Sequence, residues 1–252
     1  MKYYIVADVH GFFDILKKAL DNAGFDKNNH EHVFVSLGDL LDRGKQPREC
    51  LQFVNSLERK ILIRGNHEDL MEDMLDYGYP RVCDMHNGTY YTAADMAGKS
   101  NVDAGKSNVD DIFTAMRNDN DYNNYISSTV DYFETKSAIF VHSWIPCFYW
   151  ESWNGVLHGW SKNDNWRKIQ DWKPYRWFNG MEAWKNGIRE KDKTIFCGHW
   201  HTSFGNYRYH QSGDCEFGKT ADFSPFIDNG IVALDSCVAF SKKINVYVLE
   251  ED

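Results

Sequence analysis

Short apolar runs along the chain end abruptly at polar side chains that can bind metal ions, and this happens five times. Val, Ile and aromatic residues dominate the runs at residues 3–7, 33–38, 60–65, 138–141 and 194–198, which predicts buried β-strands. The side chains that follow these runs are Asp8 and His10, Asp39 and Asp42, Asn66 and His67, His142, and His199 and His201. Ligands in layered α/β proteins bind beyond the carboxyl ends of the strands, so we expect these side chains to meet at one edge of a sheet.

A helical pattern follows each of the first three runs. Leu16, Ala19, Leu20 and Ala23 recur at helical spacing before Gly24, which is a helix stop signal. A second helix is expected from near Pro47 to about Leu57, and a third through residues 70–75. The alternation of strands and helices predicts an α/β fold.

The stretch from about residue 78 to 136 lacks this pattern, and its polar composition predicts an inserted helical region within a single catalytic domain of residues 1–252. Inside it, residues 97–103 are repeated without change at 104–110. One copy is too short to fold by itself and the pair lacks an apolar face, so we interpret the repeat as a duplication within a loop.

A tryptophan-rich segment occupies about residues 143–192 and holds eight of the nine Trp residues of the chain. Two interpretations are open. The indoles can form the core of a packed subdomain, because large aromatic side chains dominate core energetics. Alternatively, they form a wall of a substrate site, where a Trp face can stack on a base.

Composition limits the possible partners and the location. The net charge of −9 gives no basic surface for nucleic acid, so no nucleic-acid partner is expected. No run approaches the roughly 20 apolar residues of a membrane span and no signal-peptide pattern is present, so we expect a cytoplasmic protein without a membrane partner. The six Cys residues show no CxxC spacing, which favours reduced structural thiols.

The side chains at the strand ends indicate the chemistry of the site. A set rich in imidazole nitrogen and carboxylate oxygen suits Mn²⁺ first, with Fe or Zn²⁺ as alternatives, whereas Ca²⁺ and Mg²⁺ would be poorly served by so many histidines. Asp39 is central in the set and is the natural bridging carboxylate. Two divalent metal ions held in this way could activate a shared water for attack on phosphorus without a covalent enzyme intermediate.

Five blocks of sequence together resemble the calcineurin-like metallophosphoesterases. The blocks are residues 8–11 (DVHG), 38–44 (GDLLDRG), 65–68 (GNHE), 141–142 (VH) and 198–201 (GHWH). The DRG and GNHE forms are similar to the branch that contains the bacterial and phage serine/threonine protein phosphatases and the dinucleoside tetraphosphatases. The resemblance covers about residues 3–67 and 138–202. It implies a β-sandwich of mixed sheets flanked by helices, in a four-layer αββα order.

The resemblance also implies a role for each matched residue. Asp8, His10 and His201 are implied ligands of one metal ion, Asn66, His142 and His199 are implied ligands of the other, and Asp39 bridges them. His67 is the implied general acid, oriented by Asp42, and Arg43 is the implied phosphate clamp. A second phosphate-binding arginine is expected between His142 and His199, where Arg167, Arg176 and Arg189 are available, and we select Arg176. Arg64 is expected to be structural, and Glu68 to brace the following helix.

These residues lead to a first hypothesis and several alternatives. The first is a dinuclear-metal phosphomonoesterase acting on phosphoserine or phosphothreonine in a protein, or on a small phosphoester. The second is hydrolysis of a dinucleoside polyphosphate such as diadenosine tetraphosphate, with the indoles stacking on the bases. A catalytically silent binding module and a nuclease are further alternatives, of which the first has no need of His67 and the second is opposed by the acidic charge balance. The sequence does not indicate an oligomeric state.

Overall fold

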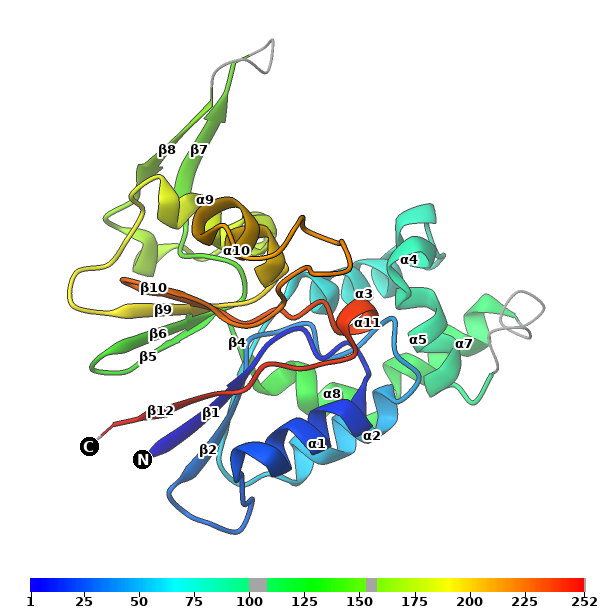
Figure 1. Ribbon diagram of the computed structural model, residues 1–252. Coiled ribbons are helices and arrows are strands. Elements are labelled where there is room, and N and C mark those ends of the chain that lie inside the picture. Colours follow the sequence, from blue (N-terminus) through cyan, green and yellow to red (C-terminus); the bar gives the residue numbers. More distant parts are fainter. Residues whose placement is uncertain (100–107, 153–157, 252) are drawn as a thin grey trace.

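Two mixed β-sheets form the centre of the protein, and helices lie on the outer side of each (Figure 1). The computed structural model describes residues 1–99, 108–152 and 158–251. The first sheet has the strand order β12-β1-β2-β3-β4, in which only β12 is antiparallel to its neighbour. Its strands are β1 (Lys2–Val6), β2 (His32–Ser36), β3 (Lys60–Ile63), β4 (Thr129–Val130) and β12 (Tyr247–Glu250).

The second sheet has the order β10-β11-β9-β6-β5, with a parallel centre and two antiparallel edge strands. Its strands are β5 (Tyr132–Glu134), β6 (Ala138–Val141), β9 (Thr194–Cys197), β10 (Phe226–Asp228) and β11 (Ile231–Ala233). A core of β-branched and aromatic side chains lies between the two sheets, where Val35 and Ile63 of the first sheet meet Phe140 and Phe196 of the second. The predicted sandwich of mixed sheets is therefore confirmed.

Helices that follow the strands cover the outer face of the first sheet, as the sequence pattern predicts. They are α1 (Phe13–Ala23), α2 (Pro47–Ser56) and α3 (Asn66–Tyr77). The apolar stripe of α1 buries Leu16 and Leu20, and α2 buries Leu51 and Val54, in one cluster with Phe34 of β2. Burying such side chains contributes roughly 1.5 to 3 kcal/mol each, so this cluster fixes the helices against the sheet.

The stretch predicted as a helical insertion contains the helices α4 (Val82–Asn87), α5 (Thr89–Met96), α7 (Val109–Arg117) and α8 (Asn120–Ser128). Helices α5, α7 and α8 pack on the same cluster through side chains that include Tyr90, Phe113 and Tyr125. The helical part ends at Ser128, and the last residues of the predicted region form strands β4 and β5 instead. Most of the seven-residue repeat, at positions 100–107, lies outside the described residues.

The tryptophan-rich segment covers the outer face of the second sheet. It contains the hairpin β7 (Cys147–Glu151) and β8 (His158–Lys162), the 3₁₀-helices η1 (Trp166–Lys168) and η2 (Lys173–Trp177), and α9 (Gly180–Lys185). Trp144, Trp166, Trp172 and Trp184 are buried in one cluster with strand residues of β6 and β9. For these four side chains the interpretation as a packed core agrees with the structure.

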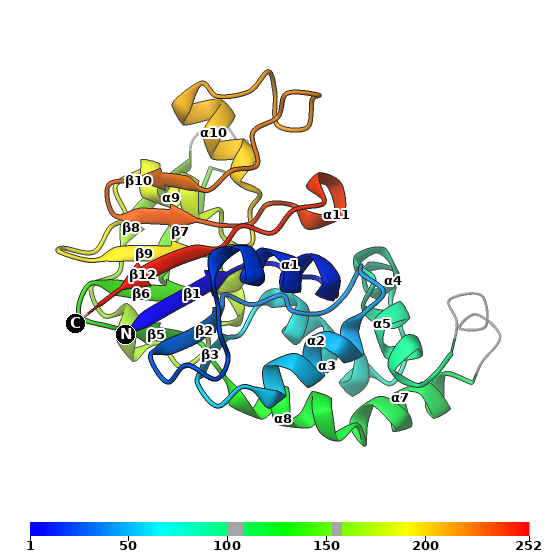
Figure 2. The same ribbon diagram turned by 60° about the horizontal axis from the view of Figure 1, so that its bottom comes forward.

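The remaining helices are α10 (Thr202–His210), which follows β9, and α11 (Val238–Ser241), which follows β11. Figure 2 shows α10 above the edge strand β10 and α11 beyond the ends of the parallel strands. Among the described residues, no helix is both long and apolar enough to cross a membrane.

Candidate metal centre

Most of the predicted site residues lie in the loops that leave the carboxyl ends of the parallel strands, while Asn66 and His67 begin α3 and Arg176 lies on η2. Several of these loops turn sharply. Asp8, His10, Asp39, Asp42, Arg43 and His199 all have positive φ, between 50° and 74°. Residues other than glycine seldom adopt this conformation, and where they do it is often held by the surrounding structure at a functional site. The turns aim side chains from several strands at one point.

At two positions in the sequence blocks, only glycine leaves room for a neighbouring carboxylate. A Cβ at Gly65 would lie 2.2 Å from Asp39 Oδ1, and a Cβ at Gly198 would lie 2.1 Å from Asp8 Oδ2. Each glycine therefore lets a carboxylate of one strand end pack against the backbone of the next strand end. This contact explains why Gly precedes Asn66 and His199.

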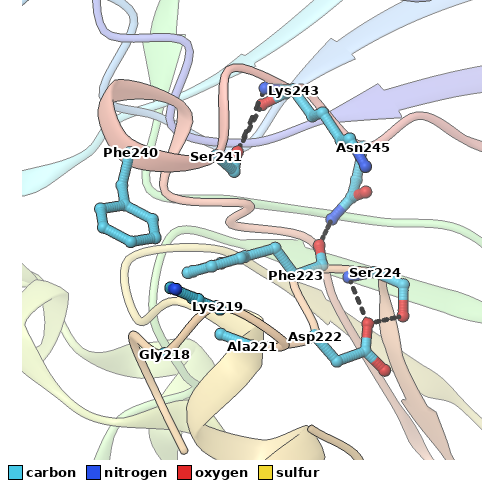
Figure 3. A pocket seen from close by; sticks show the side chains of 10 residues that line it. All are labelled: Gly218, Lys219, Ala221, Asp222, Phe223, Ser224, Phe240, Ser241, Lys243 and Asn245. Atoms are coloured by element: carbon cyan, nitrogen blue, oxygen red, sulfur yellow. Dashed lines mark hydrogen bonds between the residues drawn. The ribbon is translucent and has the colours of Figure 1, made fainter.

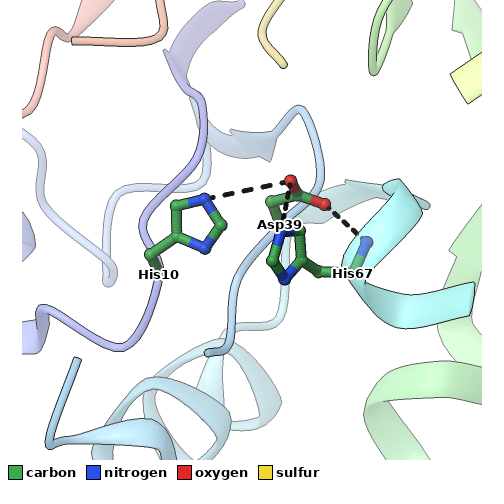
Figure 4. A group of neighbouring side chains, drawn as sticks. All are labelled: His10, Asp39 and His67. Atoms are coloured by element: carbon green, nitrogen blue, oxygen red, sulfur yellow. Dashed lines mark hydrogen bonds and ion pairs between the residues drawn. The ribbon is translucent and has the colours of Figure 1, made fainter. Parts of the chain in front are cut away.

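Asp39 belongs to two groups of side chains whose ligand atoms lie within 4.8 Å of one another. The first group is His10, Asp39 and His67, and the second is Asp39, His142 and His199. Figure 4 shows His10 and His67 facing the Asp39 carboxylate, each with Nε2 at 3.9 Å from Oδ2. His142 Nε2 lies 3.5 Å from the other oxygen, Oδ1. Asp39 is thus the residue that the two groups share.

Backbone carbonyls fix the orientation of two imidazoles. His142 Nδ1 donates to Leu37 O at 2.7 Å, and His10 Nδ1 donates to Leu41 O at 2.9 Å. A neutral imidazole that donates through Nδ1 keeps a lone pair on Nε2. In His142 this lone pair faces Asn66 Oδ1 at 2.8 Å, so two acceptors point at each other. His199 Nδ1 approaches the same Asn66 oxygen at 2.9 Å. A metal ion bound by Asn66 Oδ1, His142 Nε2 and His199 Nδ1 would give the lone pairs of these atoms a partner.

The protonation states of the buried imidazoles also favour a metal site. Burial lowers the pKa of His10 well below its ordinary value and lowers that of His199 to about 3, so both imidazoles are neutral, as metal ligands must be. Burial also raises the pKa of Asp8, and the neighbouring carboxylates of Asp235 and Asp39 raise it further. Crowded buried carboxylates and neutral imidazoles form a donor set that fits divalent metal ions.

His67 contacts two other predicted site residues, Asp42 and Arg43. Its Nδ1 donates to Asp42 Oδ2 at 2.7 Å, and Arg43 Nη2 donates to its Nε2 at 3.2 Å. Burial alone would lower the pKa of His67, but the charge of Asp39 and the bond to Asp42 outweigh it and raise the pKa. Asp42 Oδ2 also accepts a bond of 2.6 Å from Thr89 Oγ1 at the start of α5.

Glu68 braces the loop of Asp39 as well as its own helix. Its carboxylate accepts bonds from the backbone N–H groups of Gly65 (2.8 Å), Asp39 (3.0 Å) and Leu40 (3.1 Å). It also accepts a bond of 2.8 Å from the hydroxyl of Tyr125 on α8. The sequence predicted only the bond to the start of α3, so its role in holding Asp39 is an additional finding.

Two predicted metal ligands, Asp8 and His201, belong to neither group, and the predicted phosphate ligand Arg176 is bound elsewhere. His201 Nδ1 lies 2.8 Å from Ser203 Oγ, its Nε2 lies 3.7 Å from Glu216, and neither metal-binding group includes it. Arg176 is buried, with Nη1 2.5 Å from Asp69 and Nη2 paired with Asp131. Its pairs with two carboxylates give it a bracing position, and binding phosphate would require these pairs to break.

Arg64 shares Asp69 with Arg176, through Nε at 2.7 Å, and also pairs with Glu72. This network joins the end of β3 to η2 and is in keeping with the structural role expected for Arg64. Neither of the other candidate arginines is free: Arg167 pairs with Glu134 and Glu190, and Arg189 lies over the ring of Trp184.

The sequence analysis missed three residues of the site. Asp235 is buried at the end of β11, and burial raises its pKa to about 6. The apolar run at residues 231–234 that precedes it was a usable signal, because it repeats the pattern of the other five strands. Thr89 and Tyr125 carried no such signal, since they come from helices far along the chain.

Comparisons with known proteins agree with this geometry. The family model described as calcineurin-like phosphoesterase matches residues 1–216, and the chain belongs to this family of metallophosphoesterases. Its members hydrolyse phosphoric esters with divalent metal ions, so the chain has the fold and donor set of a metal-dependent hydrolase.

Two curated relatives differ in the substrate that their names state. The symmetrical bis(5'-nucleosyl)-tetraphosphatase of Actinobacillus succinogenes is 39% identical over 95 residues, which are 37% of this chain and 34% of that protein. Serine/threonine-protein phosphatase 1 of Salmonella typhimurium is 33% identical over 89 residues, which are 35% of this chain and 40% of that protein. The matches therefore span about a third of the length of these relatives.

Several solved structures resemble nearly the whole chain, and one of them illustrates the likeness. The cold-active protein-tyrosine phosphatase of a psychrophilic Shewanella species aligns with a TM-score of 0.57 over 99% of this chain and 75% of that chain, at 16% identity. At this identity the likeness is one of fold.

Proposed function

We propose that the chain is a dinuclear-metal phosphoesterase, and the observation that carries this proposal is the position of Asp39 between two donor groups. As the resemblance implies, Asp8 and His10 would hold one metal ion and Asn66, His142 and His199 the other, with Asp39, which both donor groups share, between them. Ser203 occupies Nδ1 of His201, so His201 would join the first set through Nε2. Such ions, with Mn²⁺ as the first choice, supply an activated water and neutralise charge on the phosphoryl group.

We assign the protein's own chemistry to His67, Asp42 and Arg43. Asp42 holds the His67 imidazole through Nδ1 and favours its protonated form, so Nε2 is the atom that gives a proton to the leaving oxygen. Arg43 is largely exposed at the edge of the site, where its guanidinium can bind phosphate oxygens in a forked geometry. Arg43 can donate to Nε2 only while the imidazole is neutral, so a bound phosphate that takes up Arg43 would leave Nε2 free to carry the proton.

For the substrate we favour a dinucleoside polyphosphate over a phosphorylated protein. Trp177 is 47% exposed and lies edge-on to His199, with 5.8 Å between the ring centroids, so an aromatic surface adjoins the donor set. Such a surface can stack on a nucleobase. Similarity to a tetraphosphatase supports this choice. Similarity to a serine/threonine phosphatase keeps phosphoserine and phosphothreonine as the second candidate.

The test compares substrates on one preparation. Metal-stripped protein, with and without added Mn²⁺, is assayed with p-nitrophenyl phosphate, diadenosine tetraphosphate and a phosphothreonine peptide. We expect metal-dependent turnover of the first two, with a higher kcat/KM for the dinucleotide. Preference for the peptide would select the second candidate, and no turnover of any substrate with metal bound would contradict the proposed phosphoesterase.

A further inference from the structure

A pocket of about 470 Å³ opens between the loop that follows α10 and the turn that contains α11 (Figure 3). Phe223 and Phe240 line it together with Lys219 and Lys243. Figure 3 shows the two phenyl rings facing the same space, with Lys219 beside them. None of the residues assigned above to the metal centre or to proton transfer lines this pocket.

The pocket is nevertheless connected to the metal centre through the chain and through ring contacts. The loop on one side comes after β9, His199, His201 and α10 in the chain. On the other side, α11 comes after β11 and Asp235. His201 packs on Phe217 with 4.5 Å between centroids, and Phe217 packs on Phe240 at 5.6 Å. Loops beyond the carboxyl ends of parallel strands are the usual place for substrate binding in layered α/β folds.

The aromatic surface here is open to solvent. Phe217 and Phe240 are 49% and 53% exposed, although each contacts the other and Phe223. Exposed phenyl rings grouped in this way expose apolar area to water, and a flat aromatic ligand would cover it.

The second feature of the pocket is the positive charge of its two lysine side chains. Within the described part of the chain, no carboxylate forms an ion pair with the ammonium group of Lys219 or Lys243. The nearby Asp222 is bound by the hydroxyls of Ser212 and Ser224, both at 2.6 Å. Two unpaired ammonium groups beside exposed rings, in a chain of net charge −9, complement an aromatic anion.

We propose that this pocket binds one nucleotide unit of a nucleoside polyphosphate. The base stacks among Phe223 and Phe240, a phosphate meets Lys219 and Lys243, and the remaining phosphate chain runs past His201 toward Asp39. This inference rests on the proposed function, and it makes the pocket the feature that selects a nucleotide over a phosphorylated peptide.

The test uses Phe240→Ala and the double variant Lys219→Ala/Lys243→Ala in the Mn²⁺-loaded protein. The matched controls are Phe133→Ala, which removes a 39% exposed ring on the edge strand β5, and Lys136→Ala, which removes an exposed ammonium group. Steady-state kinetics are measured with diadenosine tetraphosphate and with p-nitrophenyl phosphate, after thermal melts show that each variant is folded.

We expect KM for diadenosine tetraphosphate to rise about tenfold in each pocket variant, the scale of one lost base stack, with kcat little changed. Constants for p-nitrophenyl phosphate should stay within about twofold of wild type, as should all constants of the controls. An unchanged KM for the dinucleotide would overturn the proposal. So would an equal loss on both substrates.

Failure of the proposed function is distinguished by a binding measurement. If the wild type hydrolyses neither substrate, calorimetric titration with ADP still tests the pocket, with Mn²⁺ present at the same concentration throughout. Binding that weakens about tenfold in Phe240→Ala but not in Phe133→Ala supports the pocket. Equal binding by wild type and Phe240→Ala, or no binding at all, overturns it.

Discussion

Thr89 Oγ1 donates a 2.6 Å hydrogen bond to the same Asp42 oxygen that accepts from His67 Nδ1. Asp42 is buried, and its other oxygen, Oδ1, has no partner among the described residues, so Oδ2 forms both bonds. Thr89 is the first residue of α5, and a Cβ at the preceding Gly88 would lie 2.8 Å from the backbone nitrogen of Arg43. The helices between β3 and β4 therefore help to position the residues assigned to proton transfer.

Thr89→Val removes this hydroxyl with little change in volume. We expect kcat for phenyl phosphate to fall about three- to tenfold, the scale of one lost buried hydrogen bond, with KM little changed. Thr89→Ser keeps the hydroxyl and should retain most of the activity. Equal losses in both variants would show that Thr89 acts through packing alone.

His67→Asn tests the assignment of the general acid. We expect kcat for phenyl phosphate to fall roughly 10²- to 10⁴-fold. The loss should be much smaller for 2,4-dinitrophenyl phosphate, because its leaving oxygen needs no proton. Metal content, measured by elemental analysis, should stay at the wild-type level. A loss of bound metal would instead assign His67 as a ligand of the group that contains His10 and Asp39.

Metal binding should stabilise the folded state. At a hundredfold excess over Kd, a ligand of the native state adds about 2.7 kcal/mol to the free energy of unfolding. For a chain of this length that corresponds to a rise in Tm of about 5 to 10 °C. Thermal melts of stripped protein with added Mn²⁺ measure it. Asp39→Asn should remove most of the rise, and a full rise in that variant would contradict the bridging position.

Glu68→Gln tests the brace on the Asp39 loop. An amide cannot accept all the bonds that the carboxylate accepts from Gly65, Asp39, Leu40 and Tyr125, so buried donors lose their partners. We expect the free energy of unfolding to fall by about 2 to 4 kcal/mol, and by about 1 kcal/mol in Tyr125→Phe. Urea denaturation measures both. The exposed Glu58→Gln is the control and should match the wild type.

Arg167 gives a prediction for the pH dependence of stability. Its hydrogen bonds hold the pKa of Glu134 below the ordinary value of 4.5. A carboxylate with a lowered folded-state pKa adds stability above its unfolded-state pKa and loses it as the pH falls through the folded-state value.

Arg167→Met should therefore unfold more easily than the wild type at pH 7, by about 1 kcal/mol or less because the pair is partly exposed. The difference should shrink as the pH is lowered from 5 toward 3. Urea denaturation across this range measures the difference, and a gap that stays constant would contradict an electrostatic origin.

The sequence pattern by itself predicted an α/β fold and the residues at its strand ends, and the family resemblance implied the sandwich of mixed sheets. Buried strands need apolar side chains, so the point where each run stops marks the carboxyl end of a strand and the start of a loop. Asp8, Asp39, Asn66, His142 and His199 could be chosen for this reason, and the family resemblance agreed with that choice. Asp235 also comes directly after an apolar run, so the same rule could have identified it.

Only the tertiary structure decided which side chains outside these blocks reach the site. Thr89 and Tyr125 come from helices whose packing depends on contacts between distant parts of the chain, so no local pattern marks them. Arg176 and His201 show the converse, because their partners Asp69, Asp131 and Ser203 are known only once the chain has folded. Local sequence fixes where a strand ends, whereas long-range packing fixes what each side chain at that end meets.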